Sequence, residues 1–554
     1  MTMEKRDLLI ELGGEELPPK ALRKLMDAFR DGITEGLQQH GLQHTGVKAY
    51  ASPRRLAVIV SSLDAQQADQ SIEKRGPALN AAYDASGNPS KAAEGFARSC
   101  GVTFDALEKL VTEKGTWLVF RTQQQGQPLA QLLPGIIDNA LTKLPIPKRM
   151  RWGSHKVQFV RPVHWLVVLF GQDVIPCNIL GQNAGRTTRG HRFHAPAPIE
   201  LKQPADYCDA LAGARVIVDF DQRKARIENA VAEISGKHNA VAKVDPDLLE
   251  EVTALVEWPV PLVGQFEEVF LQVPQEALIS TMEGNQKYFP LLDGQGKLLN
   301  KFITIANLES PHPEKVIAGN EKVVRPRLSD ARFFYETDKK KSLEQHGESL
   351  KTVTFEIQLG TVYEKAERVG ELAGQIAAAI GSNVAWAERA GRLCKADLAS
   401  GMVGEFPELQ GIMGQYYATN EGEPIEVAKA LNEQYQPRFA GDEVPSTLTG
   451  AAVAIADKID TLVGILGIGK HPTGDKDPYA LRRAAIGVLR IIIEKALPLD
   501  LRWLCEKAGA LHGERLSNRN IEKDFLDFMQ GRYLAFFQEQ GISTDIVRAV
   551  LAVA

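Results

Sequence analysis

The stretch Gly464-Ile-Leu-Gly-Ile-Gly-Lys-His-Pro-Thr-Gly-Asp-Lys-Asp-Pro-Tyr-Ala-Leu-Arg-Arg483 nearly matches a nucleotide-binding loop. It fits the pattern G-x-x-x-x-G-K, but His471 stands where that loop needs a Ser or Thr to hold Mg²⁺. A phosphate loop also follows a strand and opens a helix at its lysine. Here the preceding run 451–466 has the character of a helix, and Pro472 cannot continue a helix from that lysine. We therefore interpret the stretch as a glycine-rich connection between two helices.

The end of the same stretch predicts how the second helix begins. Asp477 can cap this helix, and Pro478 suits its first position. Apolar residues then recur at helical spacing as far as about residue 497, so one face of the helix is expected in the core. Arg482 and Arg483 project from this helix. The stretch is predicted to be a rigid corner that carries arginines.

The rest of the chain divides into a mixed half and a helical half. Strand and helix patterns alternate before about residue 320, whereas long helical periodicities dominate after it. We place the main boundary between residues 320 and 345. The expected strands are 7–12, a hairpin over 47–61, 163–170, 214–220 and 302–306, with a helix over 20–39. The later expected helices are 363–380, 385–403, 426–434, 446–466, 478–497, 524–540 and 544–554.

Composition excludes several classes of protein. A chain of 554 residues with 44% hydrophobic and 24% charged residues is expected to form about three or four globular domains. The balance of 65 basic and 70 acidic residues leaves any nucleic-acid surface as a local patch on an acidic protein. The five cysteines are scattered without a C-x-x-C pair, which argues against disulfides or thiolate zinc and favours the reducing cytoplasm. No run approaches the ~20 apolar residues of a membrane span.

Three basic patches could bind a polyanion such as RNA. They occupy 143–152, 185–194 and 322–335, and each mixes cations with aromatic or hydroxyl side chains. Guanidinium groups pair with phosphates in two-point geometry, and aromatic rings stack on bases. The alternative is that each cation forms an ion pair with a local carboxylate, and the sequence leaves both readings open. The RNA-facing candidates are Lys148, Arg149, Arg151, Arg325, Arg327, Arg332, Arg482 and Arg483.

The sequence provides little support for a metal site or for a catalytic nucleophile. His191-x-x-His194 has no further ligand at a familiar spacing, and the arginines beside it would repel a cation. No G-x-S-x-G motif, Ser/His/Asp arrangement or carboxylate dyad stands out. These patterns therefore offer no candidate for a catalytic residue or a metal ligand.

The helical half resembles the HD phosphohydrolase superfamily in two short segments. In those enzymes a His-Asp pair, another histidine and a distal aspartate bind divalent metal. The aspartates match at Asp397 and Asp457, but Ala396 replaces the paired histidine and no histidine occurs between His346 and His471. Without imidazoles the metal cannot be held, so the resemblance implies a retained scaffold with a dismantled site. An active metal-dependent phosphohydrolase is the alternative.

The expected fold class is therefore multidomain α+β. A mixed α/β N-terminal body (residues 1–320) would bind RNA or a partner and could hold two or more subdomains. An all-helical HD-like domain with a degenerate metal site would follow (321–498), and then the start of a helical C-terminal domain (499–554). The last expected helix runs to the final residue without a C-cap, from which we expect a longer native chain.

Longer motifs resemble one family along essentially the whole chain, the β subunits of the bacterial α₂β₂ glycyl-tRNA synthetases. The opening stretch belongs to the same set. The matching motifs are Leu8-Leu-Ile-Glu-Leu-Gly-Gly-Glu-Glu-Leu-Pro18, Ser52-Pro-Arg-Arg-Leu56, Pro147-Lys-Arg-Met-Arg-Trp-Gly153, Arg161-Pro-Val-His-Trp165, Gly190-His-Arg-Phe193, Arg327-Leu-Ser-Asp-Ala-Arg-Phe-Phe334, Met402-Val-Gly-Glu-Phe-Pro-Glu-Leu-Gln410 and Pro437-Arg-Phe-Ala-Gly441.

This resemblance implies a division of labour between two chains. The α subunit would carry the class II core that adenylates glycine, so ATP and Mg²⁺ would be used by the holoenzyme and no cofactor by this chain. The β subunit would bind and orient tRNA(Gly) in a cytoplasmic heterotetramer. It would end in a helical anticodon-binding domain, of which residues 499–554 are the approach. A non-catalytic RNA-binding module without an α partner is the remaining alternative.

Overall fold

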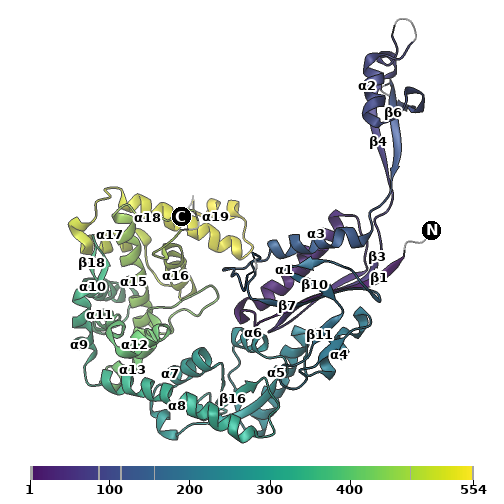
Figure 1. Ribbon diagram of the computed structural model, residues 1–554. Helices are drawn as coiled ribbons and strands as arrows, with labels where there is room; N and C mark the ends of the chain where they lie inside the picture. The colour runs from purple at the N-terminus through teal and green to yellow at the C-terminus, as the bar shows by residue number, and fades with distance from the viewer. Residues whose placement is uncertain (1–3, 85–87, 113–114, 155, 475, 552–554) are drawn as a thin grey trace. The chain divides into compact units, whose positions relative to one another are not determined.

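The computed structural model describes residues 4–84, 88–112, 115–154, 156–474 and 476–551 (Figure 1). The chain folds into two compact units. The first unit consists of residues 1–264 and 287–320, and the second of residues 265–286 and 321–554. Because the chain crosses between them more than once, each unit contains segments that are distant in sequence.

A mixed sheet forms the centre of the first unit. Its strand order is β2-β3-β1-β7-β10-β9, with β8 paired to β7. β1 lies antiparallel to both β3 and β7, whereas β10 runs parallel to β7. These strands are β1 (Lys5–Gly14), β2 (Gly46–Ser52), β3 (Arg55–Asp64), β7 (Val163–Phe170), β8 (Asp173–Val174), β9 (Asn178–Ile179) and β10 (Gln182–Gly185). The strand predictions over 7–12, 47–61 and 163–170 are confirmed.

Alternating side chains of β1 divide the two faces of this sheet. Leu8, Ile10 and Leu12 pack in the core that also holds α1 (Leu22–Gln39) and α3 (Leu129–Thr142). Leu9 points to the opposite face and packs with α4 (Tyr207–Gly213). Successive side chains of a strand point to opposite faces of the sheet, so apolar side chains occur in both sets along β1 where both faces are covered. Figure 1 shows α1 and α3 lying together near the strands of this sheet.

Smaller sheets complete the first unit. A four-stranded sheet of order β13-β15-β16-β14 packs with α5 and α6. A three-stranded sheet of order β4-β6-β5 packs with α2 around a small core of its own. The elements are β4 (Gln70–Ala78), α2 (Lys91–Cys100), β5 (Glu108–Thr112), β6 (Gly115–Gln124), β11 (Thr187–Arg189), β12 (Pro198–Glu200), α5 (Phe220–Lys237), β13 (Val241–Ala242), α6 (Pro246–Leu255), β14 (Val260–Gln265), β15 (Phe289–Leu292) and β16 (Leu298–Ala306).

Two of the expected elements are wrong. No strand forms over 214–220, because this run leads directly into α5, which begins at Phe220 with Asp219 as its cap. Val216 and Val218 are nevertheless buried, and periodicity alone cannot distinguish a short buried run from a strand. The single helix expected over 385–403 is broken into α11 (Val384–Leu393), a 3₁₀ turn and α12 (Gly401–Glu405).

A buried ion cluster lies on the sheet of the first unit. Arg55 is fully buried, and its Nη1 donates to Glu257 Oε1 at 2.7 Å. Its Nε lies 3.2 Å from Glu11 Oε1. Ser52 Oγ donates to the same Glu257 oxygen, and Thr188 Oγ1 donates to Glu11. The motif Ser52-Pro-Arg-Arg therefore turns the β2–β3 hairpin and supplies the cation at the centre of the cluster.

The second unit is built around one buried helix, α15. Nearly every residue of α15 from Thr449 to Gly467 is buried, and the helix packs against α10, α14, α16, α17 and α18. Thr447 caps its first turn. The helices are α7 (Gln275–Ser280), α8 (Pro313–Asp338, which enters from the first unit), α9 (Leu343–Glu348), α10 (Val362–Ile380), α13 (Ile412–Asn420), α14 (Ile425–Glu433), α15 (Leu448–Gly467), α16 (Leu481–Glu494), α17 (Leu501–His512), α18 (Ile521–Glu539) and α19 (Thr544–Leu551), with a short hairpin of β17 (Thr354–Glu356) and β18 (Gly360–Thr361).

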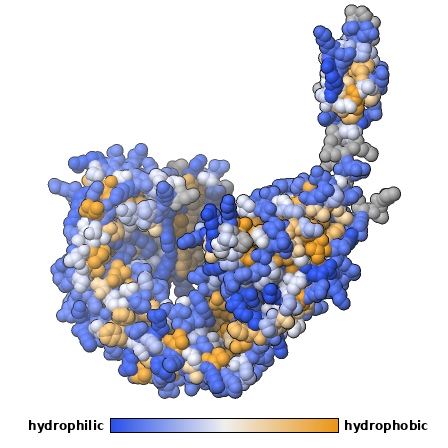
Figure 2. Space-filling view, viewed as in Figure 1, coloured by the Kyte–Doolittle hydropathy of each residue, from blue (hydrophilic) through white to orange (hydrophobic). Residues whose placement is uncertain are grey.

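The surface carries no continuous apolar band in the view of Figure 2. Hydrophobic residues there are scattered among hydrophilic ones. Within the described ranges, no helix combines the length and the apolar character that crossing a bilayer requires.

Candidate functional site

The connection from Gly464 to Arg483 does not form a phosphate cradle. α15 extends to Gly467, as predicted, and the chain then leaves the helix. Lys470 is already engaged, because its Nζ donates to Glu356 Oε1 at 2.7 Å and to the Tyr479 hydroxyl at 3.3 Å. Asp475 lies outside the described residues. The structure confirms a helix-to-helix connection here.

The start of α16 differs from the expectation. The helix begins at Leu481, so Pro478 is not its first residue. Asp477 still satisfies the first amides, since its carboxylate accepts from the N–H groups of Leu481 and Arg482, each at 2.9 Å. Asp477 therefore caps the helix from four residues before its first residue, with residues 478–480 lying between. The sequence pattern does not reveal this spacing.

Most of the eight candidate RNA-facing cations form no ion pair with a carboxylate that the structure describes. Among the described residues, Arg325 is the one member of the set that pairs with a carboxylate, with its Nε 2.6 Å from Glu267 Oε1. Lys148, Arg151 and Arg327 are exposed, and Arg332 is half-buried. In the part of the chain that the structure describes, a carboxylate partner is thus present for Arg325 and for none of the other seven.

Three of the eight cations donate to main-chain carbonyl groups. Arg149 Nη2 donates to the carbonyl oxygen of Thr142 at the end of α3. Arg482 Nη2 donates to Gly474 O at 2.6 Å, and Arg483 Nη1 donates to Arg438 O at 3.3 Å. Each of these arginines keeps further N–H groups that could reach a phosphate.

The eight cations come from three separate elements. Lys148, Arg149 and Arg151 follow α3 in the first unit, whereas the other five belong to α8 and α16 of the second unit. The structure thus groups them as three short local sets. The basic patch at 185–194 serves the fold instead: Arg192 pairs with Glu15, and the main chain of Arg189 accepts a hydrogen bond from buried Arg55.

His191 and His194 use their ring nitrogens for the main chain. His191 Nε2 lies 2.6 Å from the carbonyl oxygen of Asn307, and its Nδ1 accepts from the N–H groups of Phe193 and His194. His194 Nε2 accepts from the N–H of Glu309. The two imidazoles therefore stabilise a loop.

Two lysine ammonium groups flank Asp457 in the helical unit. Lys395 Nζ donates to Asp457 Oδ2 at 3.0 Å, and Lys365 Nζ lies 3.1 Å from Oδ1. Burial by itself raises the pKa of Asp457, but the two ammonium groups outweigh burial and hold this pKa well below its usual range. Burial likewise lowers the pKa of Lys395, and the Asp457 carboxylate outweighs it, so this pKa is raised. The carboxylate is an ion-pair partner of lysines.

Asp460, one turn further along α15, is held by three cationic or polar side chains. Arg368 Nε donates to its Oδ1 at 2.7 Å, and Lys365 Nζ donates to its Oδ2 at 3.0 Å. His512 Nε2 lies 3.2 Å from Oδ1. Burial raises the pKa of Asp460, yet Lys365 and the other partners overcome burial and lower it. Every member of this cluster is nearly or fully buried.

Asp397 has a different environment. Its Oδ2 accepts from the N–H groups of Gly411 at 2.6 Å and Gly414 at 3.0 Å. Burial raises its pKa to about 6. Its carboxylate thus fastens the loop before α13. In the described part of the chain, no group of three or more His, Cys, Asp or Glu side chains is placed to hold a metal ion.

Removal of divalent metal is expected to leave the stability of this protein unchanged. Lysine ammonium groups already neutralise Asp457, so a chelator has nothing to withdraw from it. The measurement is the thermal unfolding midpoint with and without EDTA. A midpoint that falls after chelation and recovers with Mn²⁺ would contradict this prediction.

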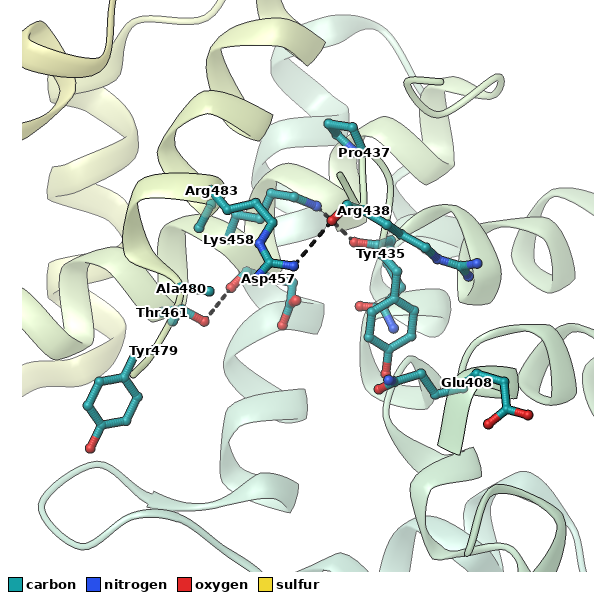
Figure 3. A pocket seen from close by; sticks show the side chains of 13 residues that line it. Glu408, Tyr435, Pro437, Arg438, Asp457, Lys458, Thr461, Tyr479, Ala480 and Arg483 are labelled. Atoms are coloured by element: carbon teal, nitrogen blue, oxygen red, sulfur yellow. Dashed lines mark hydrogen bonds between the residues drawn. The ribbon is translucent and has the colours of Figure 1, made fainter. Parts of the chain in front are cut away.

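The sequence did not reveal the lysine and arginine partners of these aspartates. Lys365 and Arg368 come from α10, about ninety residues before the aspartates they contact. A faint signal existed, because a charged residue on the apolar side of a helix usually has a buried partner. The resemblance to the HD motif identified Asp457, but it could not show which cations lie beside its carboxylate. Figure 3 shows Asp457 beside Lys458 and Thr461 at the edge of a pocket.

Comparison with known proteins agrees with the motifs. A family model described as "Glycyl-tRNA synthetase beta subunit" matches residues 8–552. Proteins named "Glycine--tRNA ligase beta subunit" from Hahella chejuensis, Pseudomonas aeruginosa and Stutzerimonas stutzeri are 57%, 56% and 56% identical to this chain. The alignments cover 99%, 99% and 100% of this chain and 80% of each relative. The chain belongs to the family of glycyl-tRNA synthetase β subunits.

Proposed function

We propose that this chain binds tRNA(Gly) and positions it for ATP-dependent glycylation at the active site of a separate α subunit. The observation that carries the proposal is the family match over residues 8–552, at more than half identity to its relatives. Glycine activation with ATP and Mg²⁺ would then belong to the α subunit of an α₂β₂ holoenzyme in the cytoplasm. This chain would supply no catalytic residue.

By holding the tRNA in place, this chain would raise the rate of glycylation without taking part in the chemical step. An oriented substrate reacts as if in an intramolecular step, and the lost freedom of motion is provided by binding contacts. Lys148, Arg149 and Arg151 would form one set of phosphate contacts. Arg325, Arg327 and Arg332 on α8 would form a second set, and Arg482 and Arg483 on α16 a third. Their unpaired or partly used N–H groups support this role.

The helical unit is best explained as an HD-like scaffold that has lost its metal. Asp397 and Asp457 keep the family spacing, but Lys395 and Lys365 contact Asp457 where a cation would be needed. An ammonium group supplies the positive charge that the carboxylate needs, but it cannot activate water as a metal ion does. This arrangement does not favour the metal-dependent phosphohydrolase.

A charge-reversal experiment on α8 tests the tRNA role. The double variant Arg325→Glu/Arg327→Glu is expected to weaken tRNA(Gly) binding by at least about tenfold, because charge-assisted contacts to phosphate are lost. The slope of log affinity against log salt should become shallower by roughly 1.5 for two lost contacts. Binding is measured with the α–β complex at several salt concentrations.

The matched control changes the same charge elsewhere on the unit. Lys351 and Arg392 are 50% and 52% exposed, and Lys351→Glu/Arg392→Glu should leave the salt slope intact. Equal losses in both double variants would show a general charge effect and reject the assignment to α8. Glycylation by this chain without an α subunit would reject the division of labour itself.

A further inference from the structure

A pocket of about 460 Å³ opens within the helical unit (Figure 3). α15, the start of α16 and the loop 434–438 form its walls. Its volume lies in the range of small-molecule sites, roughly 300–1,000 Å³. Figure 3 shows Arg483, Lys458 and Asp457 along one wall, with Tyr435 and Arg438 on the other.

Two arginines of this pocket have donors to spare. Arg483 Nη1 donates to the main-chain oxygen of Arg438 at 3.3 Å, which ties the two residues together. Arg438 Nη2 donates to Asn432 Oδ1 at 2.6 Å. Neither guanidinium forms an ion pair with a described carboxylate, and each has five N–H donors in total. Figure 3 shows the two guanidinium groups pointing in different directions, so each offers its donors separately. A single guanidinium already matches the oxygens of a phosphate in two-point geometry.

The remaining charge of the pocket also favours an anion. Asp457 lies in the wall, but Lys365 and Lys395 already neutralise its carboxylate from behind. Lys458 lies in the same wall, and its Nζ donates to carbonyl oxygens of the loop at 2.8–3.0 Å. Burial lowers the pKa of Lys458 to about 7, so it adds only part of a positive charge at neutral pH. Glu408, the other acidic residue of the lining, is exposed and accepts a hydrogen bond from Ser280. The cations of the pocket therefore outnumber its carboxylates.

Tyr435 provides an aromatic ring and an unused hydroxyl. This hydroxyl is buried without a hydrogen-bond partner among the described residues, and such groups call for an explanation. Its ring lies 5.9 Å from the Arg438 guanidinium carbon and 4.4 Å from Lys395 Nζ. Tyr479 lines the same pocket. Proteins that bind nucleotides combine aromatic rings, which stack on bases, with arginines, which contact phosphates.

We propose that this pocket binds a nucleoside phosphate, with the phosphate on Arg483, the ring system against Tyr435 and the Arg438 guanidinium beside that ring. The same chemistry is present in a free mononucleotide and in a terminal nucleotide of an RNA. The inference extends the proposed function, because Arg483 is one of the proposed tRNA contacts. It adds a ligand class and a second arginine, Arg438, which basic-patch reasoning did not select.

Equilibrium dialysis tests the proposal on the full-length chain in complex with its α partner. The ligands are AMP, GMP, CMP and UMP, and in a second arm a short single-stranded RNA, each with inorganic phosphate as a competitor. Arg438→Ala and Arg483→Ala are each expected to weaken binding by about tenfold or more, since each removes a cation that contacts the ligand. Arg502→Ala, outside the pocket, should not change it.

Tyr435→Phe separates a ligand effect from a folding effect. Its hydroxyl has no hydrogen-bond partner in the described ranges. The variant should therefore unfold at the same or a higher temperature while binding the ligand several-fold more weakly. If a mononucleotide binds and these variants weaken its binding, the pocket is a site for free nucleotides. If the RNA binds and the mononucleotides do not, the pocket is a site for the terminal nucleotide of an RNA. No binding in either arm, or binding that the three variants leave unchanged, overturns the proposal.

The charge reversal on α8 tests a different proposal, because its measurement is the affinity for tRNA. It should not change the binding of mononucleotides. Failure of the pocket proposal can therefore be distinguished from failure of the tRNA proposal.

Discussion

Replacing Arg55 with alanine is expected to destabilise the first unit by about 3–5 kcal/mol, as removal of one partner from a buried ion pair does. The guanidinium is the cation that both Glu11 and Glu257 contact, and all three side chains are at most 2% exposed. Without it the two buried carboxylates have no ion-pair partner among the described residues. Burial already raises the pKa of Glu11 despite Arg55. Urea unfolding followed by circular dichroism measures the change.

The neighbouring Arg54 is the matched control for this experiment. It follows the same proline, and its Nε donates to the carbonyl oxygen of Gly14 at 3.3 Å. It forms no ion pair with a described carboxylate, so Arg54→Ala leaves no buried charge behind. A loss of about 1 kcal/mol or less is expected, as for most changes outside the core. Equal losses for Arg54→Ala and Arg55→Ala would contradict the ion-cluster explanation.

Replacing Asp460 with alanine is expected to destabilise the helical unit by a similar amount, about 3–5 kcal/mol. Lys365 and Arg368, both about 5–6% exposed, would lose a carboxylate that they share. Asp457 could still compensate Lys365, but Arg368 has no second described carboxylate partner. Asp527→Ala, at a site 64% exposed, serves as the control and should change the free energy of unfolding little.

The same cluster predicts the direction of acid sensitivity. The pKa values of Asp457 and Asp460 are lowered in the folded state, so their ion pairs stabilise the fold at pH values above the ordinary aspartate pKa of about 4. This stabilisation is lost as the pH falls below about 4, because the unfolded chain then binds more protons. Unfolding free energies measured from pH 6 to pH 2.5 should fall more steeply for the natural protein than for Asp460→Asn.

Local patterns were sufficient for most helices and strands. The helices over 363–380 and 426–434 and the strand over 163–170 appear within about a residue of their expected bounds. Each has a clear period and a cap or turn at its ends. The prediction over 214–220 was wrong because a buried run of valines and isoleucine is compatible with several local conformations. The start of α16 was misplaced because Asp477 caps the helix from a distance.

The amino-acid sequence by itself determined the family, the failure of the near-match at Gly464–Lys470 to be a nucleotide loop, and the periodic elements on either side of it. These features depend on residues that are close along the chain. Only the tertiary structure decided that Arg55 lies between two buried glutamates, that lysines from distant segments flank Asp457, and that Arg438 and Arg483 share a pocket. The physical reason is that charge pairing and burial depend on distances across the fold, and sequence separation does not encode those distances.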